Sequence, residues 1–381
     1  MKEPAEYTAR ILTSIEQVKA GEWDALIPSG HHPFLCWNFL NACEASGSAA
    51  AHTGWTPMHI VLEDSKGIMI AAAPLYAKTH SRGEYVFDQG WANALERAGG
   101  AYYPKLQCSV PFTPATGPRL LAPCAQTRAA LLSAMEQVCT AHGFSGAHIT
   151  FMQDDDETAA MDAGWLSRND RQFHFFNHGY KTFDDFLSTL SSRKRKNIRK
   201  ERRAAQSAVT IKRLSGADLK AEHWDIFYEC YLDTGMRKWG QPYLTREFFA
   251  RIHDTMANDI LLVLAWQDGT PVAAALNFIG AEALYGRNWG ALSHTPFLHF
   301  ELCYYQAIDA GIERGLDRIE AGAQGEHKLA RGYEPVATRS AHFLSHPGLS
   351  HAVDQYLQQE RLAISREIGY LGAHLPFKKE S

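Results

Sequence analysis

The sequence lacks the features that several large protein classes require. No stretch approaches the ~20 consecutive apolar residues that cross a bilayer, and Met1–Val18 has no apolar core like that of a signal peptide. We therefore expect a cytoplasmic protein with no integral membrane segment. Gly-x-Ser-x-Gly is absent, which argues against a serine hydrolase built on that turn. Neither His-Glu-x-x-His nor Cys-x-x-Cys occurs, and His31-His32 is typical of a solvated loop, so no metal site is expected.

Paired cysteines and net positive charge are also lacking. The seven cysteines are an odd number, and most stand among apolar neighbours, as buried free thiols do. The sequence therefore predicts a reduced protein without a disulfide framework. The net charge of −4 excludes a generally basic surface. Binding to a polyanion must therefore depend on a local cluster of cations.

Length and composition indicate two folded domains. A chain of 381 residues exceeds the size at which one hydrophobic core ordinarily stops growing. Its 45% hydrophobic and 21% charged residues are typical of globular proteins. We place an N-terminal domain at 1–177, a basic bridging helix at 178–210 and a C-terminal domain at 211–381. Thr182 is the expected N-cap of the bridging helix, which is predicted to continue to about Ala205.

The C-terminal half predicts an antiparallel sheet followed by a helix and another strand. Three apolar runs separated by glycine-containing turns are typical of a meander, and they lie at 260–266, 272–279 and 283–289. A helical period then continues to Gly315 before a strand at 316–320. A similar order occurs in the N-terminal half, with an acidic loop at 154–157. The expected fold class is α/β (α+β), a tandem duplication in which each half is a mixed, mostly antiparallel sheet flanked by helices.

Four short motifs accompany this order of elements, at Tyr103–Gln107, Pro111–Pro114, Ser192–Arg199 and Gly322–Lys328. With them the chain resembles the GNAT acyltransferase superfamily, and within it the FemAB-like N-acyltransferases, which join two GNAT-like domains. The resemblance implies a peptidoglycan-related transferase that moves an acyl or aminoacyl group to an amine, such as a cell-wall precursor or small peptide. It implies acyl-CoA or aminoacyl-tRNA as co-substrate and no resident cofactor.

The chain departs from CoA-using relatives at the loop after the third strand. Those relatives carry glycines there, so that backbone N–H groups at a helix N-terminus bind the diphosphate. Here the loop at 291–297 has no such glycine pattern. In the N-terminal half Gly117 and Arg119 are the nearest substitute for a phosphate, although two prolines remove donors there. The departure favours an aminoacyl-tRNA donor or a CoA site that is built differently.

A basic run at 193–203 contains eight cations within eleven residues and a single glutamate. On a helix this charge covers most of the circumference, so burial of the helix is expected to contribute little. One interpretation is a solvated helix whose cations pair with the acidic loop at 154–157. The others are contact with a polyanion, such as a tRNA acceptor stem, a nucleotide diphosphate or CoA, and contact with an anionic membrane surface. The predicted donor or polyanion contacts are Arg193, Lys196, Arg199, Lys200 and Arg203.

The polar segment that follows the strand at 316–320 carries the predicted catalytic residues. Acyl transfer to an amine needs a base for the ammonium proton and donors for the tetrahedral oxyanion. Glu326 and His327 are the first candidates for the base, and Glu320 and Glu301 are the second candidates. The resemblance places the remaining substrate-binding candidates in this segment and on the third strand and following helix: Lys328, Arg331, Tyr333, Arg287, Asn288, Trp289 and Glu301.

Each of these assignments has a plainer alternative. The polar segment can be a surface loop that Gly332 merely closes, Glu301 can stabilise a helix N-terminus, and His299 is more typical of a packed histidine. A non-catalytic protein that binds nucleic acid or a sugar nucleotide on a degenerate acyltransferase fold also fits the sequence. The basic run could bind a polyanion without catalysis, and the loop at 291–297 lacks the glycine pattern of CoA-using enzymes. Both features leave this second class of function open.

Overall fold

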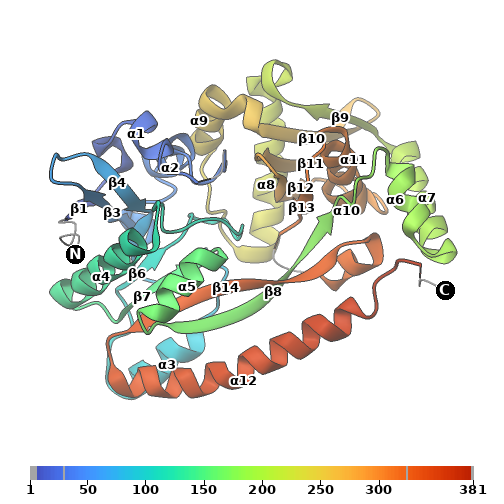
Figure 1. Cartoon of the computed structure of the whole chain (residues 1–381). Coiled ribbons are helices and arrows are strands. Elements are labelled where there is room, and N and C mark those ends of the chain that lie inside the picture. Colours follow the sequence, from blue (N-terminus) through green and yellow to red (C-terminus); the bar gives the residue numbers. More distant parts are fainter. Residues whose placement is uncertain (1–6, 29–30, 323–324, 379–381) are drawn as a thin grey trace. The chain divides into compact units, whose positions relative to one another are not determined.

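The computed structural model forms two compact units and describes residues 7–28, 31–322 and 325–378 (Figure 1). Unit 1 contains the chain to Asp170 together with Ala337–Ser365. Unit 2 contains Arg171–Val336 together with the chain from Arg366. Each unit is therefore built from two separate segments of the chain.

The units differ from the predicted domains at 1–177, 178–210 and 211–381. The basic run lies inside unit 2, which begins at Arg171, and does not form a separate bridging element. A C-terminal segment joins the N-terminal unit. Local sequence patterns predict where strands and helices lie, but the sheet that a late strand joins depends on pairing with residues far away in the sequence.

Unit 1 contains two sheets. The strand orders are β1-β3-β4 and β2-β5-β6-β7-β14, and neighbouring strands pair antiparallel except β6 with β7. Helix α4 connects that parallel pair. The elements are β1 Thr8–Leu12, α1 Ala20–Asp24, α2 Trp37–Ala45, β2 Trp55–Pro57, β3 His59–Glu63, β4 Met69–Ala73, β5 Leu75–Lys78, α3 Gln89–Arg97, β6 Lys105–Cys108, α4 Ala125–His142, β7 Gly146–Thr150, α5 Asp154–Asp162, β8 Leu166–Phe176 and β14 Glu334–Leu344, the last two extending into unit 2.

The predicted acidic loop at 154–157 is instead the first turn of α5. Four acidic side chains at a helix N-terminus interact favourably with the exposed N–H groups there, which explains why this segment is helical. Arg128 pairs with Asp155 at 3.1 Å, and Arg339 pairs with Asp154 at 2.7 Å. These acids therefore have arginine partners within their own unit.

One face of the larger unit 1 sheet is unusually polar. In the strand register Tyr76 lies beside Gln107, Gln107 beside His148, and His148 beside His342, and all four side chains are buried. Two residues along, Lys78 lies beside Lys105 on the same face. The opposite face carries aliphatic residues of a core that α4 covers. The polar face is held together by hydrogen bonds and ion pairs.

Lys105 is the centre of this buried polar cluster. Its Nζ donates to Glu84 Oε2 at 2.7 Å and also to Asp88. The Tyr102 hydroxyl donates to Asp88 at 2.7 Å. Lys78 lies 3.5 Å from the centroid of the Trp55 ring, and burial lowers its pKa to about 6. Each buried carboxylate thus has a cation within reach, as buried charges require.

His148 and His342 form a second buried pair on this face. Their Nδ1 atoms lie 2.8 Å apart, so one ring must donate and the other must accept. Burial lowers the pKa of His148 to about 3 and the pKa of His342 well below its ordinary value. Both imidazoles are therefore neutral in the folded protein at neutral pH.

We expect this pair to make the protein lose stability in mild acid. The unfolded state takes up protons as pH falls below about 6.5, while burial keeps both imidazoles neutral in the folded state well below that range. Each histidine therefore costs up to about 1.4 kcal/mol per pH unit there. Urea unfolding of the wild type at pH 7.5, 6 and 5 measures this slope. His148→Gln/His342→Gln is expected to flatten it. Equal slopes in that variant and in the surface control His142→Gln/His351→Gln would contradict the assignment.

Unit 2 is a six-stranded sheet with helices. The strand order is β8-β13-β12-β11-β10-β9, antiparallel except for β12 with β13. As in unit 1, a helical connection joins the parallel pair. The elements are α6 Phe183–Thr189, α7 Ser192–Ala208, β9 Thr210–Leu214, α8 Ala221–Trp239, α9 Arg246–Met256, β10 Ile260–Gln267, β11 Thr270–Ile279, β12 Ala283–Ala291, α10 Leu298–Phe300, a π-helical turn η5 Glu301–Tyr305, α11 Gln306–Glu313, β13 Arg318–Glu320 and a 3-10 segment η6 Glu326–Arg331. Helix α12, Pro347–Gly372, begins in unit 1.

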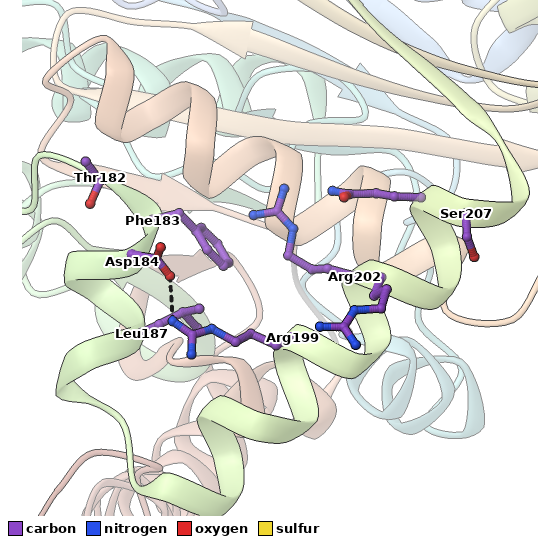
Figure 2. A pocket seen from close by; sticks show the side chains of 9 residues that line it. Thr182, Phe183, Asp184, Leu187, Arg199, Arg202 and Ser207 are labelled. Carbon is purple, nitrogen blue, oxygen red and sulfur yellow. Dashed lines mark hydrogen bonds and ion pairs between the residues drawn. The ribbon is translucent and has the colours of Figure 1, made fainter.

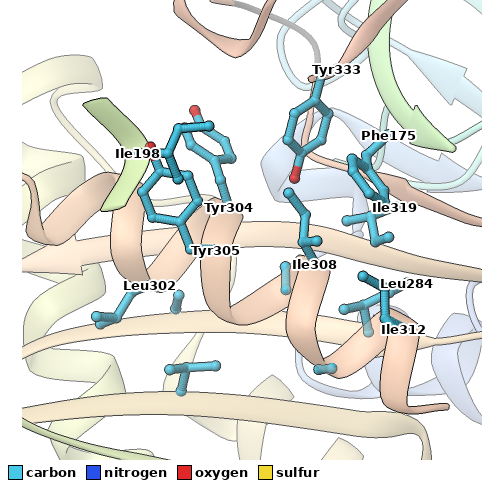
Figure 3. Packing of buried hydrophobic residues seen from close by; sticks show 14 of the residues in the cluster. Phe175, Ile198, Leu284, Leu302, Tyr304, Tyr305, Ile308, Ile312, Ile319 and Tyr333 are labelled. Carbon is cyan, nitrogen blue, oxygen red and sulfur yellow. The ribbon is translucent and has the colours of Figure 1, made fainter. Parts of the chain in front are cut away.

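The predicted helix after the third strand is present, but it is interrupted. Its apolar positions form the stripe that the sequence indicated, and Figure 3 shows Leu302, Ile308 and Ile312 packed in the core of unit 2. The π-helical turn η5 separates α10 from α11. Such turns are rare and often occur at functional sites. Gly315 follows the helix with a positive φ of 66°, as its predicted capping role requires.

The predicted continuous helix from Thr182 to Ala205 is two helices, α6 and α7. The predicted cap is correct: Thr182 accepts from the Asp185 N–H, and Asp185 accepts from the Thr182 N–H. The chain then turns at Leu190, which is fully buried and forms a β-bridge with Phe377. Burial of Leu190 therefore ends α6, although the sequence pattern alone is compatible with one continuous helix.

Within the described ranges, each helix is either too short or too polar to span a bilayer.

Candidate functional site

The parallel strands β12 and β13 separate at the centre of unit 2. Their pairing ends at Tyr285 and Glu320, while β12 continues to Ala291. At this point β12 carries a bulge: Gly286 and Asn288 face consecutive residues of β11, so Arg287 is the extra residue. The bulge interrupts the two-residue period at Arg287, and the predicted alternation of Arg287 and Trp289 against Asn288 stays a prediction.

The segment after β13 contains the short helix η6. Gly325, with φ 118°, precedes it, and Gly332, with φ 84°, ends it, and both values are strained for any other residue. Lys328 and Arg331 both belong to this single 3-10 helical segment. The side chain of Glu326 lies outside the part of the chain that the structure describes.

His327 is an exposed residue of η6. Its Nε2 lies 2.8 Å from the Tyr304 hydroxyl. Partial burial, together with the charges of Arg331 and Lys328, lowers the pKa of His327, while burial raises the pKa of Tyr304. At neutral pH the tyrosine therefore keeps its proton and donates, and the histidine is neutral and accepts at Nε2. A neutral imidazole of this kind can accept a proton.

Lys328 points inward beside His327. Only 1% of it is exposed, and its Nζ donates to the Gly322 carbonyl at 2.7 Å. Burial lowers its pKa to about 8. At neutral pH the group is mostly charged, and one carbonyl satisfies only one of its three N–H donors. It can therefore stabilise a negative charge.

Arg331 is held on three sides. One guanidinium nitrogen donates to Glu201 Oε2 at 2.9 Å, and another donates to the His327 carbonyl at 2.7 Å. The guanidinium lies 3.4 Å from the centroid of the Phe300 ring, at a distance typical of a strong cation–π contact. Arg331 thus connects α7, α10 and η6.

A cavity of about 490 Å³ lies at the end of β12, and its lining residue Phe300 contacts both His327 and Arg331. Trp289, His299 and Phe300 line it. The ring centroids of Trp289 and His299 are 5.2 Å apart, and that of His327 lies 5.6 Å from Phe300. The structure thus brings together three predicted residues, Trp289, His327 and Arg331, around His299 and Phe300.

Two predicted site residues are enclosed by their surroundings. Tyr333 is fully buried, and Figure 3 places it among the core side chains of unit 2. Glu301 is also fully buried and accepts from Arg202 at 3.2 Å and from Gln206 at 2.8 Å. Glu301 is therefore a structural anion of the π-helical turn rather than a surface of the cavity. Arg287 and Asn288 are half-buried on β12.

The five predicted cations of the basic run all lie exposed on α7. Helix periodicity gives α7 an inner face as well, where Ile198 and Ala205 are buried. A groove of about 760 Å³ separates α6 from α7, and Figure 2 shows Arg199 and Arg202 beside Phe183 in it. The exposed cations on α7 are Arg193, Lys196, Arg199, Lys200 and Arg203.

Arg119 of unit 1, a predicted phosphate contact, is committed to the backbone. It is fully buried, and its Nε donates to the Thr150 carbonyl at 2.9 Å, while Nη1 donates to the Gly117 carbonyl at 3.1 Å. These bonds hold the loop before α4 in place. The guanidinium is structural here.

Sequence reasoning missed Tyr304 and Glu201 as parts of this site. Tyr304 belongs to an apolar helix pattern that also describes a core, and Glu201 is hidden within a basic run. Only the contacts of Arg331 and His327 identify them. Within the described residues, no group of three or more His, Cys, Asp or Glu could hold a metal ion.

Comparison with known proteins identifies the family and the fold. The model of the FemAB-like family, described as peptidoglycan biosynthesis/recognition, matches residues 14–379. No curated protein matches the chain. Among solved structures the chain is similar to FemX, with a TM-score of 0.56 and 13% identity over 88% of this chain and 98% of that chain. It is also similar to the C-terminal domain of a putative lysylphosphatidylglycerol synthetase from Agrobacterium fabrum, with a TM-score of 0.53 and 8% identity over 89% of this chain and 96% of that chain. The predicted fold class is confirmed.

Proposed function

Because the chain belongs to the FemAB-like family of peptidoglycan biosynthesis and recognition, we propose that its transferase activity moves an acyl or aminoacyl group from an activated ester or thioester to an amine. The acceptor class is a peptidoglycan precursor or small peptide, and the place of action is the cytoplasm. The observation that carries the proposal is a neutral histidine that bonds Tyr304 and packs against two aromatic side chains of a cavity, His299 and Phe300, while the buried Lys328 follows it in the chain.

The residues of η6 suit the two chemical needs of this reaction. The amine attacks the acyl carbon directly, and the proton that it loses is taken by His327 Nε2, directly or through the Tyr304 hydroxyl. The C–O or C–S bond to the donor then breaks, and the proton held by His327 passes to the departing alkoxide or thiolate. The ammonium of Lys328 stabilises the oxyanion or a neighbouring anionic group. Arg331 anchors the segment and contributes positive charge. The half-buried bulge at Arg287 lies on the strand edge where β13 no longer pairs.

An aminoacyl-tRNA is the favoured donor. The loop at 291–297 has no glycine pattern for a diphosphate, whereas exposed cations on α7 offer several phosphate contacts. Eleven helical residues span ~16 Å, enough for several successive phosphates of a strand. No large apolar side chain is exposed on the described α6 and α7, which favours a hydrophilic polyanion over a membrane surface. Acyl-CoA is the second candidate donor.

A transfer screen tests the proposal. Radiolabelled acetyl-CoA and a set of charged tRNAs are offered with a panel of amines that includes peptidoglycan precursors. We expect label to move from a tRNA donor to an amine, and Lys196→Gln/Lys200→Gln is expected to weaken tRNA binding and its salt dependence. Transfer from none of the donors would contradict the proposed activity. Salt-sensitive tRNA binding without transfer would instead support a nucleic-acid-binding protein.

A further inference from the structure

Helix α7 has two faces with different partners. Its outer face carries Lys196, Lys200 and Arg203, which are exposed. Its inner face packs against unit 2, where Ile198 is buried in the core. Glu201 is the one acidic residue of the basic run at 193–203, and it belongs to the inner face. The helix therefore separates its single carboxylate from its exposed cations.

Glu201 holds two groups of the candidate site. Its Oε2 accepts from Arg331 at 2.9 Å and also from the Tyr305 hydroxyl. Tyr305 belongs to the π-helical turn η5, and burial raises its pKa, so that it stays protonated and donates. The side chains of Glu201 and Arg331 are 19% and 8% exposed, so solvent screens this pair less than a surface ion pair.

Arg331 connects Glu201 of α7 to the backbone of η6. While Glu201 holds one nitrogen of its guanidinium, another donates to the His327 carbonyl at 2.7 Å, and the plane lies over Phe300. The guanidinium therefore ties the backbone of His327 to α7 and to α10. Two forked hydrogen bonds and a ring contact define one orientation, which a lysine in place of Arg331 would not reproduce.

We propose that Glu201 is a positioning residue of the transferase site: through Arg331 it fixes η6, and with it His327, to the helix that presents the exposed cations. The proposal rests on the proposed function only in the role given to His327. In this arrangement the outer face of α7 binds the polyanion, and its inner face holds η6, the segment that contains the proton acceptor. A donor bound on the outer face is thereby held in fixed geometry to His327.

Removing the carboxylate is expected to release Arg331. In Glu201→Gln the guanidinium would be buried without its anion, and a buried unpaired charge is costly, so we expect the side chain to turn toward solvent. Its positive charge then no longer opposes protonation of His327. The pKa of His327 should rise toward its ordinary value, and its ring should become more mobile.

Proton NMR of the His327 imidazole in the full chain measures this effect, with the resonance identified by its loss in His327→Gln. Glu201→Asp retains a carboxylate and is expected to fall between the wild type and Glu201→Gln. Glu313→Gln is the matched control, because it removes a glutamate that pairs with Arg213 at 2.9 Å on the surface of the same unit. An unchanged His327 titration in Glu201→Gln, or an equal change in Glu313→Gln, would overturn the proposal.

This measurement needs neither donor nor acceptor, so a transfer screen that fails would leave its result intact. With a donor identified, Glu201→Gln is expected to lower kcat about tenfold with little change in KM, because it disturbs geometry in the reacting complex rather than binding. Equal kcat in the wild type and Glu201→Gln would count against positioning even if the NMR shift is observed.

Discussion

Replacing Lys328 by methionine is expected to lower the rate of acyl transfer by about 10²- to 10³-fold, the usual effect of removing one donor to a developing oxyanion. Methionine keeps the buried stem filled but removes the ammonium that now donates to the Gly322 carbonyl. The measurement is kcat with the donor and acceptor found in the transfer screen. Lys220→Met, at an exposed lysine of the same unit, is the matched control.

The pH dependence of kcat gives a second readout of the same prediction. Activity that needs the charged form of Lys328 should fall as pH rises through about 8, the pKa to which burial lowers this group. Activity that needs neutral His327 should fall only below the ordinary range of histidine, because its pKa is lowered. In Lys328→Met the alkaline fall should disappear while the acidic fall remains. A full rate in that variant would exclude an essential role for the ammonium.

Replacing Lys105 by methionine is expected to destabilise unit 1 by about 3–5 kcal/mol, which is typical when one partner of a buried ion pair is removed. Lys105 is 1% exposed and is the cation that both Glu84 and Asp88 contact. Without it, two carboxylates are left in a buried site. Burial already raises the pKa of Glu84 to about 7, so this group would be the first to take up a proton.

Urea unfolding at pH 7.5 measures that loss, with Lys66→Met on an exposed turn as the matched control. Lys105→Met/Glu84→Gln/Asp88→Asn removes the stranded charges as well and is expected to recover much of the lost stability. A change below about 1 kcal/mol in the single variant, which is the range of surface ion pairs, would show that water reaches this cluster in solution.

The sequence predicted the unit 2 elements well because their determinants are local. Apolar runs closed by glycine turns define β10, β11 and β12, and the apolar stripe ending at Gly315 defines the helix. Gly332 similarly ends η6, since only a residue that tolerates positive φ closes that turn. The bulge at Arg287 was missed, because a bulge depends on the register of the neighbouring strand.

The candidate site was predicted in part. His327, Lys328 and Arg331 follow from a cationic segment between two strands, and Trp289 follows from its position on β12. Tyr333 was assigned to the site although it lies in the core, because an aromatic residue after a glycine fits both roles equally in sequence.

The sequence by itself determined the order of strands and helices, the glycine-closed turns and the family, since each depends on residues close together in the chain. Only the tertiary structure decided that the strand β14 serves unit 1, that Lys328 is buried beside an exposed histidine, and that Glu201 of the basic run faces Arg331. The physical reason is that burial and ion pairing depend on which distant segments meet, and neither periodicity nor charge spacing specifies those partners.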